Sequence, residues 1–329
     1  ATVNGTWIAD KSVALCVMSG EVGLRRYQIK QKEKGSKARF VELELPKETT
    51  LSFKQDEVKA IAANLSGTRV AIGFASGKVV IYDGDLEKKC AGYYPAEDAG
   101  KCGIISICFS PCGRNIVAVK DDGKAFYWKP APSKNASKGG GKGKSSQKVT
   151  GFVPPHNLSP SSLRGCFAIQ SGRDSGMVMF SGLNQKKKSY LSKWVVDDSK
   201  GGRAELKRIV YAHDSPITAV AGHCDHTQPS RRGQQAAVVA TGCSEGHICI
   251  FSTRDMSRLM RVPRAHMIFV THLSFSGDGS RLVSVSADAG ARITSVPKAG
   301  LLQSQLHLLL AIIFAIIALV ARFYSSLGQ

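Results

Sequence analysis

Short apolar stretches separated by polar turns alternate along most of the chain. Three of them share one plan: a strand with alternating apolar residues, a turn, a second apolar strand, a turn containing Gly, and a third strand. They are EVKAIAANLSGTRVAIGFASGKVVIYD from Glu57, GIISICFSPCGRNIVAVKDDGKAFYW from Gly103 and AHMIFVTHLSFSGDGSRLVSVSADAGARI from Ala265. A period of two between such turns predicts half-buried antiparallel strands.

The turn glycines keep register among the three copies. Turn positions that need a positive φ favour Gly, so spacings of ten, ten and eleven residues predict that each copy makes the same two turns. The pairs are Gly67 and Gly77, Gly113 and Gly123, and Gly279 and Gly290.

Weaker copies begin at Val13, Gly165 and Pro216 and bring the visible units to about six. Repeats of this length with about four short strands are typical of β-propeller blades. Aromatic residues close several third strands and are expected in the packed layer: Tyr82, Trp128, Trp194 and Phe251. The pattern therefore predicts an all-β, WD-repeat-like β-propeller over residues 1–298.

Composition agrees with one large β core, because 43% of the residues are hydrophobic and almost no long amphipathic helical pattern occurs. The nine cysteines lie mostly in predicted strands, and no CxxC pair occurs. Buried free thiols behave as small apolar side chains in a reducing compartment, so we expect a domain without structural disulfides.

The C-terminal segment breaks the repeat pattern. Residues 308–321 are an unbroken apolar run, and residues 307–324 are long enough to span a thin bilayer if Arg322 reaches the interface. The alternative is a buried core helix or a closing strand, but a propeller has no place for a helix that is apolar all round. We expect a linker over 299–306, a transmembrane helix over 307–324 and a lumenal tail over 325–329.

Charge predicts the orientation of that span. Nearly all Lys and Arg precede it, including Arg292 and Lys298, which places the propeller in the cytosol. No secretory signal opens the chain, so the tail itself would direct insertion. Four N-x-S/T sequons would then stay unmodified: those at Asn4, Asn64, Asn135 and Asn157.

The net charge of +20 comes largely from basic segments that are predicted to be loops: residues 130–150, Lys186–Lys188 and Lys30–Lys37. Residues 130–150 contain KGGGKGKSS, which resembles a phosphate-binding loop. Lys138 stands where that motif requires its first Gly, and no strand or helix flanks the run, so we predict a flexible basic insertion instead. Basic loops also make anionic lipid head groups an expected further contact, whereas few aromatics and no known module argue against nucleic acid.

Few residues are candidates for a catalytic or metal-binding role. His213 and His266 each follow Ala at the start of a unit and are predicted to form hydrogen bonds within a blade. Cys224 with His223 and His226 could bind a metal, but no second ligand pair stands at zinc spacing. No serine-histidine-aspartate or paired-carboxylate arrangement is evident. We predict a protein that is not an enzyme, and we assign no catalytic, cofactor-binding or metal residue.

Residues 240–293 carry a resemblance to a known family. The most specific part is Arg264–His266 followed by Val270–Thr271, which leads into the last unit and then the apolar segment. It resembles the endoplasmic reticulum (ER) membrane exchange factors for Sar-type small GTPases, which include the animal prolactin regulatory element-binding protein. The resemblance implies a seven-bladed propeller that recruits the GTPase to the ER, exchanges GDP for GTP and starts COPII coat assembly.

One feature departs from that family. Its glycine-rich first-blade loop binds a potassium ion and contacts the GTPase, whereas no such loop precedes Trp7, and Gly139–Gly143 falls in another blade. The stretch TWIADKSVALCVMSG looks like the end of a blade, and a propeller closes its ring by pairing terminal strands. We therefore expect a chain that lacks part of its first blade; the alternative is a divergent relative.

Two other functions remain open from the sequence. A relative without exchange activity could act as an ER-exit accessory for selected cargo. A tail-anchored propeller could instead be a scaffold that gathers other proteins without any GTPase.

Overall fold

The computed structural model of the chain describes residues 4–8, 13–17, 23–34, 38–44, 50–53, 56–93, 102–130, 148–152, 161–170, 177–197, 202–224 and 237–297. Residues 1–3, most of the basic insertion 130–150 and the segment 299–329 lie outside these ranges. In the described part, no helix is long and apolar enough to cross a membrane. The predicted span over 307–324 falls on residues that are not described.

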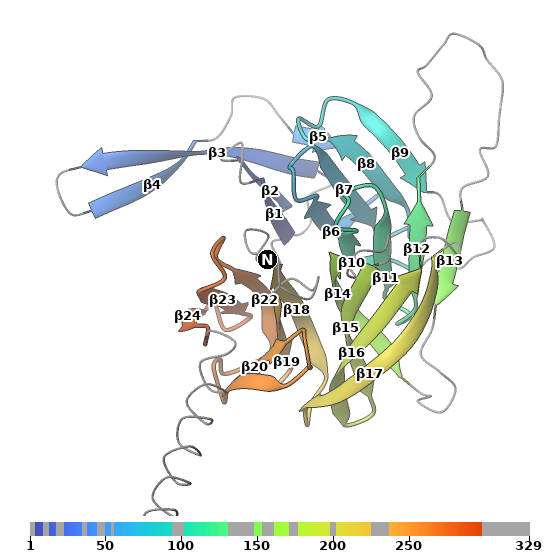
Figure 1. Cartoon of the computed structure of the whole chain (residues 1–329). Coiled ribbons are helices and arrows are strands. Elements are labelled where there is room, and N and C mark those ends of the chain that lie inside the picture. The colour runs from blue at the N-terminus through green and yellow to red at the C-terminus, as the bar shows by residue number, and fades with distance from the viewer. Residues whose placement is uncertain are drawn as a thin grey trace, which may run out of the picture.

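The described strands form six antiparallel sheets, which we call blades 1 to 6 in chain order (Figure 1). Blade 1 contains β1 (Asn4–Ile8), β2 (Val13–Val17), β3 (Gly23–Lys34), β4 (Ala38–Glu44) and β5 (Thr50–Ser52). Blade 2 contains β6 (Val58–Ala63), β7 (Arg69–Phe74), β8 (Val79–Asp83) and β9 (Lys89–Tyr93). Blade 3 contains β10 (Ile104–Phe109), β11 (Ile116–Lys120), β12 (Ala125–Lys129) and β13 (Lys148–Phe152).

The remaining blades follow the same plan. Blade 4 contains β14 (Ser162–Gln170), β15 (Met177–Gln185), β16 (Lys188–Asp197) and β17 (Arg203–His213). Blade 5 contains β18 (Ile217–Cys224), β19 (Ala237–Cys243), β20 (Ile248–Ser252) and β21 (Arg258–Val262). Blade 6 contains β22 (Val270–Phe275), β23 (Arg281–Ser286) and β24 (Ala291–Ser295). Six sheets confirm the six repeats visible in the sequence.

The first strand of each blade lies innermost. β1, β6, β10, β14, β18 and β22 pack side by side in that order, so the blades follow one another around a common centre (Figure 1). Within each of blades 2 to 6, the strands pair in chain order from the inside outward. This is the arrangement of propeller blades.

The core lies between blades rather than within one sheet. One apolar cluster joins blades 2 and 3 around Ile81, Ile104 and Trp128, and similar clusters join each later pair of neighbours. The second strand of a blade is therefore buried on both faces, as all seven residues of β19 are. Such strands read as continuous apolar runs because both of their faces exclude water.

Blade 6 is the exception. In β23, buried and less buried residues alternate, so that Leu282 is fully buried while Val283 is 38% exposed. Val283 pairs with Ile293 of β24, which is 66% exposed. Among the described residues, blade 6 is thus covered on the face toward blade 5 and uncovered on the other face.

The structure corrects several predictions in and beside the early blades. β1 packs beside the innermost strand β6, so TWIADKSVALCVMSG begins a sheet rather than ending one. Lys30–Lys34 belongs to β3 and pairs with β4, so this part of the basic run is not a loop, and residues 35–37 lie outside the described residues (Figure 1). Lys148–Thr150, predicted as insertion, lies in β13, where pairing with β12 completes blade 3.

One turn differs from its prediction by a residue. Gly67, Gly77, Gly113, Gly123 and Gly279 have a positive φ, as the spacing predicts. In the last turn, however, Ala289 takes the left-handed conformation (φ 59°) in place of Gly290. Gly279 and Ala289 are ten residues apart, so the backbone keeps the spacing of the other repeats even though the sequence does not.

The two ends of blade 6 are distinct. At one end, which we call the loop end, lie the connection from β21 to β22 and the turn from β23 to β24. At the other, the exit end, lies the turn from β22 to β23, where the Val296 amide donates a 2.8 Å hydrogen bond to the Ser280 carbonyl. The chain therefore leaves blade 6 at the end opposite to the β21–β22 connection.

Candidate functional site

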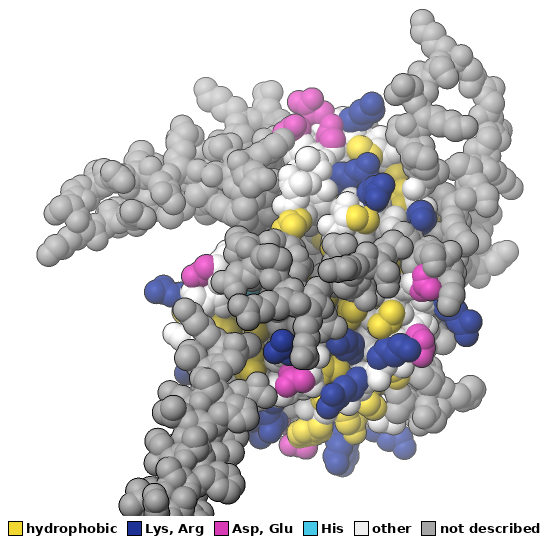
Figure 2. Space-filling view, in the orientation of Figure 1, with side chains coloured by type: hydrophobic (Ala, Val, Ile, Leu, Met, Phe, Trp, Pro, Cys, Tyr) yellow, Lys and Arg dark blue, Asp and Glu magenta, His cyan; other side chains and the backbone are white. Residues whose placement is uncertain are grey.

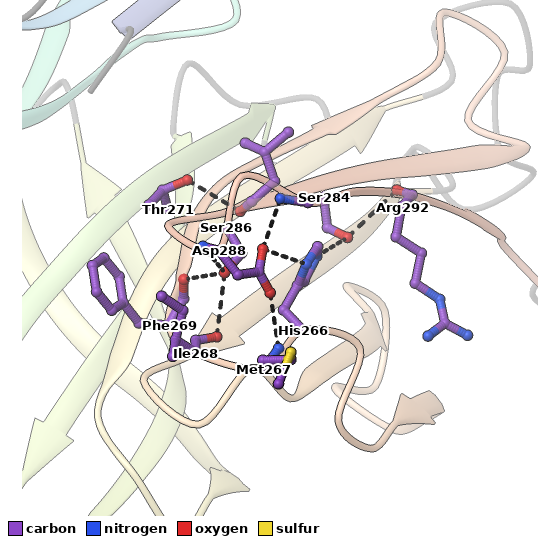
Figure 3. Close-up of polar contacts among 11 residues, drawn as sticks. His266, Met267, Ile268, Phe269, Thr271, Ser284, Ser286, Asp288 and Arg292 are labelled. Atoms are coloured by element: carbon purple, nitrogen blue, oxygen red, sulfur yellow. Dashed lines mark hydrogen bonds and ion pairs between the residues drawn. The ribbon is translucent and has the colours of Figure 1, made fainter. Parts of the chain in front are cut away.

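The connection between β21 and β22 is held in place by hydrogen bonds to both neighbouring blades. Arg264 has a positive φ (46°), and its amide donates to His247 Nδ1 at 2.7 Å. The His266 amide donates to the Gly246 carbonyl at 3.2 Å. Ser286 Oγ donates to the Phe269 carbonyl at 2.9 Å (Figure 3). The path of this loop is therefore fixed before any partner binds.

His266 is the buried centre of this arrangement (Figure 3). Its Nε2 lies 2.8 Å from Ser284 Oγ, and that hydroxyl lies 3.4 Å from the Arg292 carbonyl. Its Nδ1 lies 3.8 Å from a carboxylate oxygen of Asp288. A buried imidazole with partners on both sides orients the loop, and the predicted hydrogen bond within the blade is confirmed.

Asp288 ties the loop to the β23–β24 turn. Its carboxylate accepts hydrogen bonds from the amides of Met267 at 2.9 Å and Gly290 at 2.8 Å. These two backbone donors hold the pKa of Asp288 below its ordinary value, because they favour the charged form. The ionised carboxylate thus fixes the backbone at the exposed tip of the loop.

A similar pair joins blades 4 and 5. His213 Nε2 lies 2.9 Å from Thr241 Oγ1, and both side chains are buried. Burial, with a smaller contribution from nearby His247, lowers the pKa of His213 to about 4. His213 is therefore neutral at physiological pH. Its predicted hydrogen bond is present, but it joins the last strand of blade 4 to blade 5 rather than lying within one blade.

Three consecutive large apolar side chains project from the loop. Met267 is 90% exposed, Ile268 40% and Phe269 44%. We call these residues the apolar tip. Their side chains lie at the loop end of blade 6, outside the core between blades 5 and 6 (Figure 3).

An open pocket of about 980 Å³ adjoins the apolar tip at the junction of blades 5 and 6. Exposed Arg264 and Arg292 line it together with Met267 and Ile268. Neither guanidinium forms an ion pair with another described residue. On the face shown in Figure 2, Lys and Arg side chains are widely spread, with fewer carboxylates between them.

This arrangement is suited to binding rather than catalysis. A fixed loop that presents apolar and cationic groups beside a pocket offers contact area and charge. The hydroxyl that lies next to a base here, that of Ser284 beside His266, is fully buried and holds the loop rather than facing the pocket. In the part of the chain that the structure describes, no group of three or more His, Cys, Asp or Glu could hold a metal. His223 and Cys224 are described on β18, whereas His226 is not.

Similarity to known repeat proteins identifies the type of fold. A sequence model of the WD domain, G-beta repeat, matches residues 89–129 and 257–295. Each match starts at the outer strand of one blade and runs through three strands of the next. The chain is a WD-repeat β-propeller. The second match includes the whole β21–β22 connection.

Two individual proteins are similar to this WD-repeat propeller. SEC12-like protein 2 of Arabidopsis thaliana is 40% identical over 63 residues, which are 19% of this chain and 16% of that protein. The chain thus matches a small part of this relative's length. The β-propeller domain of Cps50 (Swd1) from Myceliophteria thermophila has a TM-score of 0.48 and 15% identity, covering 75% of this chain and 68% of that one.

Sequence reasoning located the loop but missed the apolar tip. The sequence stretch from Ala265 includes Met267, Ile268 and Phe269, but no role was predicted for them, and β22 begins only at Val270. A signal was present: the equivalent stretch after His213 reads Asp214-Ser215-Pro216. Polar or turn-forming residues at that point indicate that the fold does not need apolar ones there.

Proposed function

We propose that this protein is a guanine-nucleotide exchange factor for a Sar-type small GTPase and acts at the ER membrane at the start of COPII coat assembly. The similarity to SEC12-like protein 2 carries this proposal. The resemblance of residues 240–293 to the exchange-factor family supports it, since that stretch includes the last repeat and its arginine-alanine-histidine opening.

The fold is compatible with this role because exchange needs binding surfaces and no catalytic side chains of its own. A protein that binds the nucleotide-free GTPase better than the nucleotide-bound form must, by linkage, weaken nucleotide binding by the same factor. A propeller presents its loops on rigid strands, which suits the recognition of one conformation of a partner.

The proposal includes a membrane anchor over 307–324 with the propeller in the cytosol. The apolar run and the Lys and Arg residues that precede it support this topology. An anchor would confine the propeller to the surface where a membrane-bound GTPase is activated, which raises the effective concentration of the two partners.

The test is release of a fluorescent GDP analogue from the organism's Sar-type GTPase. The full chain is reconstituted in liposomes, and empty liposomes serve as the control. We expect faster release in proportion to the amount of reconstituted chain. Unchanged release in the presence of folded protein would contradict exchange activity.

Binding separates the two remaining functions if exchange fails. The same liposomes are sedimented with the nucleotide-free GTPase. Binding without faster release would favour an ER-exit accessory, and the absence of binding would favour a scaffold that acts without the GTPase.

A further inference from the structure

We propose that the apolar tip, together with Arg264 and Arg292, is a docking surface for an acidic segment of a partner protein that carries large apolar side chains. This inference goes beyond nucleotide exchange, because it concerns a surface and a ligand chemistry that the exchange reaction does not require.

The repeat itself indicates that the fold does not need the apolar tip. The Ala287 amide donates to the Phe269 carbonyl just as the Ser244 amide donates to the Pro216 carbonyl. This bond aligns Met267-Ile268-Phe269 with Asp214-Ser215-Pro216. Blade 2 has the same bond: the Ala75 amide donates to the Glu57 carbonyl, so Glu57 is the residue there that aligns with Phe269. Among the connections that lead into blades 2, 5 and 6, only the one into blade 6 has large apolar residues at the aligned positions.

The exposure of the tip is costly in water and is not relieved by local packing. Three consecutive residues of this connection expose large apolar side chains, and one of these is 90% exposed. Contiguous apolar patches on soluble domains mark interaction sites, whereas single exposed apolar residues do not.

The tip is also preorganised. Met267 is held through its amide by Asp288, and Ser286 Oγ donates to the carbonyls of Phe269 at 2.9 Å and Ile268 at 3.4 Å. A partner would therefore order little of this backbone on binding, which removes part of the entropic cost of association.

Charge selects an acidic ligand. The carboxylates of the pocket are already engaged: Glu245 lies 3.5 Å from His247 Nε2, and Asp288 accepts the loop amides. Arg264 and Arg292 are exposed on the same pocket and have no carboxylate partner among the described residues. Among the charged side chains that line the pocket, the two guanidinium groups are therefore the ones left without a partner, so carboxylates next to an apolar anchor are their complement.

A bilayer would also attract an apolar loop with nearby arginines, but the geometry disfavours it. The chain leaves blade 6 at the exit end, where Val296 is bonded to Ser280. The apolar tip lies at the opposite end of the same strands. If the chain is anchored after Val296, the tip faces away from the membrane and toward soluble proteins.

The test uses the full chain in detergent micelles and a set of fluorescein-labelled six-residue peptides. Each acidic probe has two apolar residues, drawn from Leu, Phe, Met and Trp, flanked by pairs of Glu. Matched probes replace every Glu by Lys or both apolar residues by Ser. Fluorescence anisotropy measures the dissociation constants. We expect at least one acidic probe to bind at least about tenfold more tightly than both of its matched probes.

The repeat supplies the control variant. Met267→Asp, Ile268→Ser and Phe269→Pro together give this loop the residues that the blade 5 connection already accommodates at the same register. We expect this triple variant to fold and to weaken acidic-probe binding at least about tenfold, and Arg264→Ser with Arg292→Ser to weaken it about fivefold or more. Unchanged far-ultraviolet circular dichroism and thermal midpoint establish folding.

Three results of the peptide assay would overturn the proposal. They are equal binding of the acidic and Lys probes, no binding by any acidic probe, and undiminished binding by the folded triple variant. A separate assay tests the bilayer: an environment-sensitive fluorescent amino acid at position 267 should keep its aqueous emission in phosphatidylcholine–phosphatidylserine vesicles. A blue shift there would assign the tip to lipid instead. No GTPase is present in these assays, so their outcome is independent of exchange activity.

Discussion

His213 connects blade stability to pH. Its imidazole is buried against Thr241, and burial keeps its pKa at about 4, below the 6.5 of an unperturbed histidine. Between these two values the unfolded chain binds a proton that the folded chain does not. The stabilisation is therefore complete above about pH 6.5 and is lost as the pH falls toward 4.

We expect His213 to contribute a decrease of up to about 3 kcal/mol in the free energy of unfolding between pH 7 and pH 4. Urea titrations at several pH values measure it, and His213→Gln should remove this part of the pH dependence. Thr241→Ser keeps the hydroxyl, as Ser284 does in blade 6, and should retain it. An identical pH dependence in the wild type and His213→Gln would contradict the assignment.

Gly246 and Ala289 occupy equivalent turns with different tolerance. Both have a positive φ, 74° and 59°. A Cβ on Gly246 would lie 2.1 Å from the His266 carbonyl oxygen, so a side chain there would displace the connection that carries the apolar tip. The turn of blade 6 already accommodates a methyl group.

We expect Gly246→Ala to lower the free energy of unfolding by at least about 2 kcal/mol, since it combines backbone strain with a steric clash. Ala289→Gly should change it by less than about 1 kcal/mol, because relief of strain and the added flexibility of the unfolded chain oppose each other. Equal effects of the two substitutions, measured by urea unfolding, would indicate that the turns are not equivalent.

Strand β23 has one face that is covered by blade 5 and one face that is uncovered. Leu282 and Val283 are neighbours in sequence, but Leu282 points into the core shared with blade 5 and Val283 into the uncovered face. A strand with one covered face alternates in this way because successive side chains point in opposite directions.

This difference gives a paired prediction. Leu282→Ala should cost about 2–5 kcal/mol of unfolding free energy, because it leaves a cavity in a packed core. Val283→Ala should cost less than about 1 kcal/mol. Thermal and urea unfolding of both variants check this, and a comparable cost for Val283→Ala would mean that a further element covers the outer face.

The sequence predicted the strands best where one turn type recurs. The glycine pairs in blades 2 and 3 located both turns, and the apolar runs between them became β7 and β11. Prediction was weaker where local composition and pairing disagree. Lys30–Lys34 reads as a loop because of its charge, yet it pairs with β4, the next strand along the chain, so composition alone did not reveal this pairing.

The candidate site was also predictable only in part from the sequence. The network around His266 was predictable because a histidine at the start of a repeat needs a partner within its blade. The exposure of Met267 was not, because apolar residues before a strand resemble the strand itself. Only alignment by the bond from Ala287 to Phe269 places these residues in the connection.

If residues 307–324 anchor the chain in a membrane, as proposed, the direction of the last strands determines which side of the propeller faces that membrane. β24 runs from the apolar tip toward the Ser276–Ser280 turn, and Val296 is bonded to Ser280. Residues 297–306 then separate it from the apolar run. Ten residues reach at most about 35 Å, which is comparable to the diameter of a small domain.

A membrane-anchored chain should therefore hold the exit end of blade 6 nearer to the bilayer than the loop end. We expect a fluorescent amino acid at position 280 to transfer energy to rhodamine-labelled lipid more efficiently than the same amino acid at position 267, in liposomes that contain the full chain. The two positions lie at opposite ends of the same sheet, so each is the control for the other. Equal transfer would mean that the linker lets the propeller turn freely. Stronger transfer from position 267 would place the apolar tip at the membrane and reverse the orientation argued from β24.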